Sequence, residues 1–562
     1  MPDEKIMMNH GVSKRFWFLD YMAIPALIVF IAYQPDFIRG FIDRFEAGKE
    51  LACINEVFLG KLPYKDIFIP FGPLNTYLEA FFMLLLGKNL AILIGYFYYG
   101  TIITLITGYF IGRSLCYGRF FSYAIALALI VETYHPFWAT RWGGIRFGFG
   151  LLAVLCAINF FKKEKNLWAF FAGVSVMVAF LTTMDVGILS LVAISLTFCF
   201  YAVFNFARNK IFKLKGFILF FIGILVALIP FITYFIFKGA FLPYVNTLVV
   251  IAGNHTRVWG QSGISLNLME YIKIDQIFKY NFKYIFPVLL YVYSIIYLIR
   301  RILKKTICWK DYSILCLSIY GLLMYKTAFR AMLGPQFAMS LQPAIILGFV
   351  FLEDLFNYII KLKRRIAINK INFIKLIVFT AIFALAVSYA VFSEKRFYGS
   401  FKEWFLYQKY KSYLMPTYGG VIPVSELRFS SLTIDRAKGV IVPGGQAEEI
   451  EGVTRYILSV TSPGEPVFTF PEHGMYNFFT NRPAVGRFPI AGIAWLTKEY
   501  QSELLSSLKE AKPRYVIFGK NLSNLAKSIG RKEELLPDIS AFIKEHYDVV
   551  KSFNTVDIYR LR

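Results

Sequence analysis

Long apolar runs, each close to the length that crosses a lipid bilayer, recur from Tyr21 to Phe392 and then stop. A helix needs about 20 mainly apolar residues to cross the hydrocarbon core. Because a helix satisfies its own backbone hydrogen bonds, a chain with many such runs is expected to fold as a helical bundle in a membrane. Hydrophobic residues make up 57% of the sequence, which is typical of a chain that has lipid as its main solvent. The mixed polar sequence after Phe392 predicts a second, soluble domain.

The basic residues predict the direction of each span. The formal net charge is +25, but Lys and Arg lie in short loops between the apolar runs instead of forming one basic face, so nucleic acid is not a predicted partner. Short basic loops of membrane proteins lie on the cytoplasmic side. The predicted spans, about eleven in number, lie near residues 17–35, 89–112, 120–135, 143–161, 167–184, 186–206, 216–237, 284–300, 311–326, 338–358 and 372–392. This threading places the N-terminus in the cytoplasm and the C-terminal domain outside it.

The predicted fold class is a polytopic α-helical membrane protein with a C-terminal soluble α/β domain. The transmembrane domain covers residues 1–392 and contains a long first outer loop, 36–88. Within that loop, the apolar stretch Leu74 to Leu86 is predicted to be a juxtamembrane or re-entrant helix, because a further span there would put the next basic loop on the wrong side. Residues 393–562 alternate short β runs with helical stretches, which predicts the extracytoplasmic α/β domain.

Two acids of the first outer loop are candidates for catalysis. Asp43 and Glu46 follow the first span, and their spacing of three predicts that both carboxylates lie on one helix face. A carboxylate held partly desolvated at a membrane surface can take a proton from an acceptor hydroxyl, as a general base does. The alternative is a solvated helix start, with both acids paired to neighbouring Arg and Lys.

The same loop resembles the first outer loop of the GT-C glycosyltransferases. The matching residues are Asp43, Phe45, Glu46, Gly48, Leu51, Gly60, Pro63, Tyr64, Asp66, Phe68, Gly72 and Pro73. The resemblance implies transfer of a sugar from a polyprenyl-phosphate donor to an acceptor outside the membrane, with Asp43 as the base and Glu46 or Asp66 in support. It also implies the inner (plasma) membrane of a bacterium. The run Thr183 to Gly187 departs from the family, because it lacks the Lys that relatives often carry there.

Cations at the outer surface are candidates for binding the donor phosphate. A lipid phosphate that leaves with growing negative charge needs such a partner. The predicted outer helix ends carry Arg141, Arg146, Lys326 and Arg330, of which Arg330 is our leading candidate. The alternative is that these side chains anchor helix ends among the lipid headgroups.

The remaining candidates are His135 and His255, which lie beside aromatic residues in outer loops, and Asp185. The aromatic residues could stack on a sugar ring or belong to the interfacial belt. No sequence spacing typical of zinc ligands occurs, but Asp43, Asp66 and Asp185 with a His form a candidate set for a divalent metal ion. In the C-terminal domain, Glu472 and His473 have no nucleotide-binding context. We expect His473 at the surface, and the domain to bind the acceptor or to act as a cap.

Together these patterns predict an inverting glycosyltransferase that acts on an extracytoplasmic lipid, glycan or protein acceptor, in contact with membrane lipids. A transporter or flippase for a lipid-linked or glycan substrate is the alternative, because many spans around a polar cavity would also serve it. The acids gather at one surface and no two-fold repeat is visible in the sequence, which favours the transferase.

Overall fold

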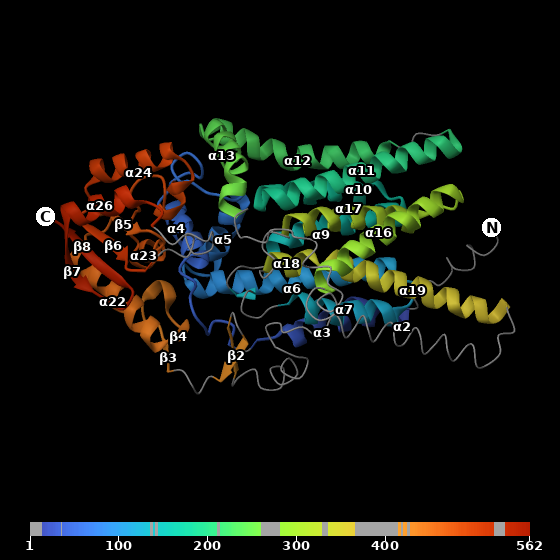
Figure 1. The fold of residues 1–562 in the computed structure, drawn as a ribbon, viewed down its shortest axis with the longest axis horizontal. Helices are drawn as coiled ribbons and strands as arrows, with labels where there is room; N and C mark the ends of the chain where they lie inside the picture. Colours follow the sequence, from blue (N-terminus) through green and yellow to red (C-terminus); the bar gives the residue numbers. More distant parts are fainter. Residues whose placement is uncertain are drawn as a thin grey trace.

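The fold is described from a computed structural model of the chain, drawn in Figure 1. The structure describes residues 14–34, 36–134, 139–140, 144–210, 214–259, 282–328, 335–365, 414–417, 420–423, 428–521 and 534–562.

A long helical bundle forms one end of the molecule and an α/β domain the other, with α4 and α5 of the first outer loop between them (Figure 1). The helices before the C-terminal domain are α2 (Lys14–Phe18), η1 (Leu19–Ala23), α3 (Ile24–Ala32), α4 (Glu46–Phe58), α5 (Pro73–Leu86), α6 (Leu90–Leu115), α7 (Arg119–Thr133), α9 (Ile145–Lys163), α10 (Asn166–Thr182), α11 (Met184–Asn209), α12 (Lys215–Phe237), α13 (Phe241–Trp259), α16 (Phe282–Leu303), α17 (Trp309–Ala328), α18 (Pro335–Ser340) and α19 (Gln342–Arg365). Every predicted span except 372–392 coincides with a helix or helical run, and that last span lies outside the described residues.

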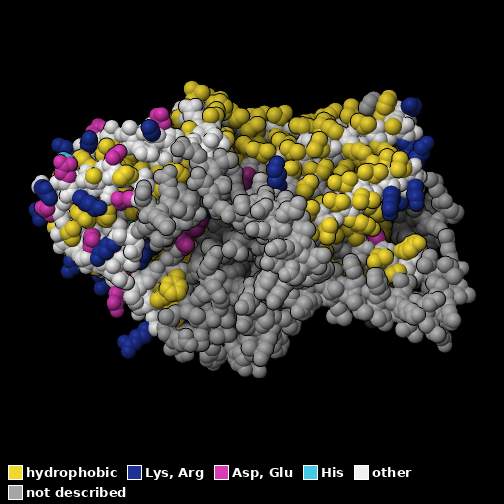
Figure 2. All heavy atoms as spheres, viewed as in Figure 1, with side chains coloured by type: hydrophobic (Ala, Val, Ile, Leu, Met, Phe, Trp, Pro, Cys, Tyr) yellow, Lys and Arg dark blue, Asp and Glu magenta, His cyan; other side chains and the backbone are white. Residues whose placement is uncertain are grey.

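The surface of the bundle is that of an integral membrane protein. Among the described residues, six helices are long and apolar enough to cross a membrane. Large hydrophobic side chains of α12 are exposed, including Ile218, Leu225 and Ile229, and Figure 2 shows hydrophobic atoms spread along this side of the bundle. Lys and Arg gather at the end of the bundle opposite the α/β domain (Figure 2). This segregation matches the basic loops from which the spans were predicted.

Small residues allow two of these helices to approach closely. A Cβ built on Gly173 of α10 would lie 1.9 Å from the backbone oxygen of Phe220 in α12, and one on Gly223 would lie 2.1 Å from that of Phe170. Neither position has room for a side chain. Without a hydrophobic force between helices in lipid, close backbone packing of this kind is a main source of helix association.

The first outer loop contains two helices, and the segment between the predicted spans 216–237 and 284–300 contains another, α13. The stretch predicted at Leu74 to Leu86 is α5, which packs against α4, α6 and α10 and is only 14 residues long. The sequence analysis did not predict α13, which lies between the bundle and the C-terminal domain (Figure 1). Its Val250 and Ile251 pack on the core of that domain.

The C-terminal domain has the predicted α/β architecture. Its elements are β1 (Leu414–Thr417), β2 (Gly420–Pro423), β3 (Phe429–Ser431), η5 (Asp435–Ala437), β4 (Ile441–Pro443), α22 (Gly444–Val460), β5 (Val467–Phe470), α23 (Met475–Thr480), η6 (Ala491–Leu496), α24 (Lys498–Ala511), β6 (Tyr515–Gly519), α26 (Pro537–His546), β7 (Tyr547–Ser552) and β8 (Val556–Leu561). The main sheet has the order β5-β6-β8-β7, in which β5 and β6 are parallel and the other pairs antiparallel.

This domain docks on α4 through close packing and buried polar bonds. A Cβ on Gly474 would lie 2.7 Å from that of Ala52, and the amide of Asn55 donates to the backbone oxygen of Arg482 at 3.0 Å. The loop before α23 is buried by the same contact. His473, expected at the surface, is only 8% exposed, and burial, with a smaller effect of Arg44, lowers the pKa of its ring to about 3.

Candidate active site

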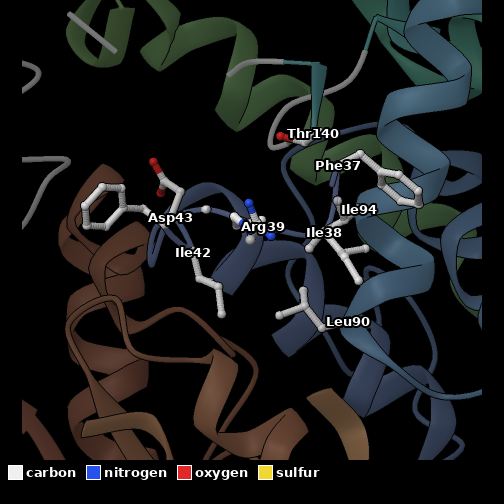
Figure 3. A pocket seen from close by; sticks show the side chains of 11 residues that line it. Phe37, Ile38, Arg39, Ile42, Asp43, Leu90, Ile94 and Thr140 are labelled. Carbon is white, nitrogen blue, oxygen red and sulfur yellow. The ribbon is translucent and has the colours of Figure 1, made fainter. Parts of the chain in front are cut away.

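The segment that leads from the first span to α4 lines a small pocket. The pocket is bordered by residues 37–43, by Ala47 of α4, by Leu90 and Ile94 of α6, and by Thr140. Figure 3 shows Asp43 and Arg39 at this pocket, with the side chain of Ile42 turned to the other side of the segment. An acid and a cation therefore share one pocket, which the first outer loop forms with α6 and Thr140.

Asp43 lies just before α4, not on its face. Its Oδ1 atom accepts hydrogen bonds from the backbone N–H groups of Phe45 and Glu46, both at 2.8 Å. The first N–H groups of a helix have no partner within the helix, and a short acidic side chain satisfies them well. The expectation that Asp43 and Glu46 lie on one helix face is therefore wrong, because α4 begins at Glu46 and Asp43 lies before it, where its carboxylate accepts from the N–H groups of Phe45 and Glu46.

Arg39 lines the same pocket as Asp43, and the sequence analysis did not consider it. Its guanidinium pairs with Asp36 at 3.0 Å and lies 5.8 Å from the ring centroid of Phe429. The side chain is 23% exposed, so it is partly open to a ligand. Arg39 could have been found from the sequence, because it follows the outer end of the first predicted span. Arg141 was chosen as a phosphate-binding candidate for the same reason.

Glu46 begins a buried chain of alternating charges. Lys49 pairs with Glu46 at 2.9 Å and with Glu50 at 3.5 Å, and Arg146 of α9 pairs with Glu50 at 2.8 Å. Burial would raise the pKa of the Glu46 carboxyl, but Lys49 and the more distant Arg146 outweigh it, so its pKa lies below the ordinary range. Glu46 is therefore ionised at neutral pH. The structure thus joins two predicted residues, Glu46 and Arg146, through Lys49 and Glu50. The pairing of Glu46 with a neighbouring Lys was the alternative interpretation of this helix start, whereas Glu50 was not considered.

This row of paired charges extends to α5. The Asn75 side-chain amide donates to Glu50 at 3.0 Å and to Glu79 at 3.1 Å. The ring of Phe71 lies 4.4 Å from the Lys49 ammonium and 4.5 Å from the Arg146 guanidinium. With its charges paired and its cations on an aromatic face, the network fixes α4 against α5 and α9.

The other predicted site residues lie apart from this network or outside the described structure. Asp66 is exposed and accepts from the backbone N–H of Leu62 at 2.8 Å, and Asp185 is exposed in the first turn of α11. Lys326 is exposed near the end of α17. The residues outside the described structure are His135, Arg141 and Arg330, together with the side chain of His255. Their proposed roles stay predictions.

A metal site built from the acids alone is not formed. Within the described ranges, no group of three or more His, Cys, Asp or Glu side chains could hold a metal ion. Asp43, Asp66 and Asp185 all lie in those ranges, so these three acids do not come together as ligands.

The comparisons with known proteins identify the fold. No family model and no curated protein matches the sequence, but solved structures match it over nearly its whole length. ArnT from Cupriavidus metallidurans bound to undecaprenyl phosphate matches with a TM-score of 0.53 and 12% identity, over 97% of this chain and 98% of that one. The archaeal oligosaccharyltransferase AglB from Archaeoglobus fulgidus, in complex with an inhibitory peptide and a dolichol-phosphate, matches with a TM-score of 0.50 and 11% identity, over 97% and 75%.

The chain therefore shares the fold of ArnT and of the archaeal oligosaccharyltransferase AglB. A further structure of the Archaeoglobus fulgidus oligosaccharyltransferase, with Zn and sulfate, matches with a TM-score of 0.51 and 10% identity, over 96% and 73%. At these identities the likeness concerns the fold, so the activity must be argued from the site.

Proposed function

We propose that the protein is a glycosyltransferase that moves a sugar from a polyprenyl-phosphate donor to an extracytoplasmic lipid, glycan or protein acceptor. The observation that carries the proposal is the pocket that Asp43 and Arg39 both line, on a segment that is hydrogen-bonded to the C-terminal domain. The fold shared with ArnT, a protein solved with undecaprenyl phosphate, supports this class of donor.

In the proposed reaction, Asp43 accepts the proton of the acceptor hydroxyl as its oxygen attacks the anomeric carbon of the sugar. The bond from that carbon to the phosphate oxygen breaks, and polyprenyl phosphate leaves with the electron pair. Attack on the face opposite the phosphate inverts the anomeric configuration. The growing charge on the leaving phosphate requires a cation, and Arg39 joins Arg141, Arg330 and Lys326 as a candidate.

Arg146 and Glu46 take supporting roles in this proposal. The Arg146 side chain is 3% exposed and is paired with Glu50, so it is placed to stabilise the charges under α4. Glu46 pairs with Lys49 in the same network, one turn from the capping carboxylate of Asp43. Both therefore help to fix the start of α4. Asp66, Asp185, His135 and His255 remain candidates for contact with the sugar or the acceptor.

The test is release of polyprenyl phosphate from radiolabelled polyprenyl-phosphate sugars, with purified full-length protein and a membrane extract as the acceptor source. We expect Asp43→Asn to lower the rate by about 10²- to 10⁴-fold, the usual contribution of a general base. Asp538→Asn, at an exposed carboxylate of α26, is the matched control and should keep the wild-type rate.

Wild-type activity in Asp43→Asn would refute the role of the base. Binding of the donor without turnover by the wild-type protein, even with varied acceptors, would favour a transporter or flippase. The anomeric configuration of the product, measured by NMR, decides the stereochemical course, and retention would contradict direct attack by the acceptor.

A further inference from the structure

The segment that carries Asp43 is bonded to the C-terminal domain at every second residue. The backbone N–H of Gly40 donates to Ile441 of β4 at 2.9 Å, and the oxygen of Ile38 accepts from Ile441 at 3.3 Å. Two residues further on, Ile42 donates to Oε1 of Gln446 at 3.0 Å and accepts from its Nε2 at 2.9 Å. The segment thus lies along β4 and the first turn of α22.

The last of these bonds joins Arg44 to Glu449 at 2.7 Å. The Glu449 side chain is 1% exposed, and its second oxygen accepts from the backbone and the hydroxyl of Thr555, both at 2.8 Å. The hydroxyl of Tyr476 donates at 3.3 Å to Oε1 of Glu449, the oxygen that also pairs with Arg44. Hydrogen bonds within the C-terminal domain therefore fix the Glu449 carboxylate. Its ion pair with Arg44 in turn holds Arg44 in place.

Two of these bonds flank the residue that carries the proposed base. Asp43 lies between Ile42, whose backbone N–H and oxygen are both bonded to Gln446, and Arg44, whose guanidinium is paired with Glu449. Figure 3 shows Asp43 and Ile42 among the side chains that line the pocket. The position of the Asp43 backbone at the pocket therefore depends on contacts with the C-terminal domain.

We propose that Gln446 and Glu449 are positioning residues for Asp43, so that the C-terminal domain completes the active site instead of only covering it. The proposal rests on the proposed function, in which Asp43 is the base. Gln446 gives the more direct test of the two residues. Its side-chain amide bonds both the backbone N–H and the backbone oxygen of Ile42, the residue directly before Asp43. A displacement of about 1 Å at a reacting group can lower a rate by about 10²-fold.

The experiment compares Gln446→Met with the wild-type protein in two measurements on the purified full-length chain. Met has a similar length and no hydrogen-bonding amide. Hydrogen–deuterium exchange reports on the backbone N–H groups of Gly40 and Ile42, and steady-state kinetics report on turnover of the polyprenyl-phosphate sugar. Glu448→Gln, an exposed neighbour on α22, is the control.

We expect Gln446→Met to speed exchange across residues 38–44, while exchange in the β5-β6-β8-β7 sheet stays unchanged. We expect kcat to fall about 10- to 100-fold with KM for the donor unchanged within about twofold. Gln446→Glu keeps an acceptor for the N–H of Ile42 but loses the N–H that donates to the Ile42 oxygen. Its kcat should therefore lie between those of the wild type and Gln446→Met. Glu448→Gln should match the wild type in both measurements.

Faster exchange with an unchanged kcat would overturn the proposal and leave the proposed function standing. Unchanged exchange would overturn it as well, because Gln446 would then not hold the segment. A rise in KM with constant kcat would assign Gln446 to binding, which also contradicts positioning. If the wild type itself releases no polyprenyl phosphate, the proposed function fails, and the positioning role fails with it, whatever the exchange shows.

Discussion

Lys49 holds a positive charge in a nearly water-free position, where its side chain is only 4% exposed. Removing one partner of a buried charge is costly, and Lys49 would then keep only Glu50, at 3.5 Å, which it shares with Arg146. We therefore expect Glu46→Gln to lower stability at neutral pH by about 1.5–3 kcal/mol, the range for a hydrogen bond to a charged group. The midpoint of thermal unfolding in detergent is the measurement.

The pH dependence of that loss follows from the pKa of Glu46, which lies below the ordinary range in the folded protein. A lowered pKa in the folded state adds stability above the pKa of the unfolded state, about 4.3 for Glu. That stability is lost as the pH falls through the folded value. The gap between the wild type and Glu46→Gln should therefore shrink below about pH 4. A gap that stays constant there would show that the ionised pair with Lys49 is not its cause.

At the scale of elements, the close packing of α10 against α12 can be tested with substitutions that change no charge. Ala is usually more stable than Gly inside a helix by about 0.5–1 kcal/mol. At Gly173 the added methyl group would lie 1.9 Å from a backbone oxygen of α12, so we expect Gly173→Ala to destabilise by about 1–3 kcal/mol. Gly253→Ala in α13, where the methyl group meets open space, should be neutral or stabilising. Equal melting midpoints for the two variants would contradict this crossing.

The sequence predicted elements well where the signal is local. The length of the apolar runs predicted the spans. The β runs predicted at residues 439–443, 466–470, 514–519 and 556–561 contain β4, β5, β6 and β8. It missed α13, because the apolar part of that helix, Phe241–Asn254, is shorter than a membrane span and was not considered as a helix that packs on another domain. It also misplaced Asp43, since a spacing of three fits both a helix face and an N-cap followed by a helix.

At the scale of the whole molecule, the site is assembled by contacts that no local pattern contains. Gln446 is 404 positions from Ile42, and Glu449 is 405 positions from Arg44. A single sequence carries no signal for such pairs, so Asp43 could be chosen from its loop while its supports in the C-terminal domain could not. The same holds for Arg146, whose charge was visible but whose partner Glu50 lies 96 positions away.

The arrangement of the whole molecule also predicts how it lies in the membrane. Basic residues gather at the end of the bundle opposite the α/β domain (Figure 2), and such residues mark the cytoplasmic side. In a variant without the native cysteines, we expect a membrane-impermeant maleimide to label Glu448→Cys in intact cells or right-side-out vesicles. Lys304→Cys, exposed just beyond α16 at the basic end, should react only after permeabilisation. Both positions should react in detergent, which controls for accessibility. Labelling of Lys304→Cys alone in intact membranes would reverse the orientation, and it would place the pocket of Asp43 on the cytoplasmic side.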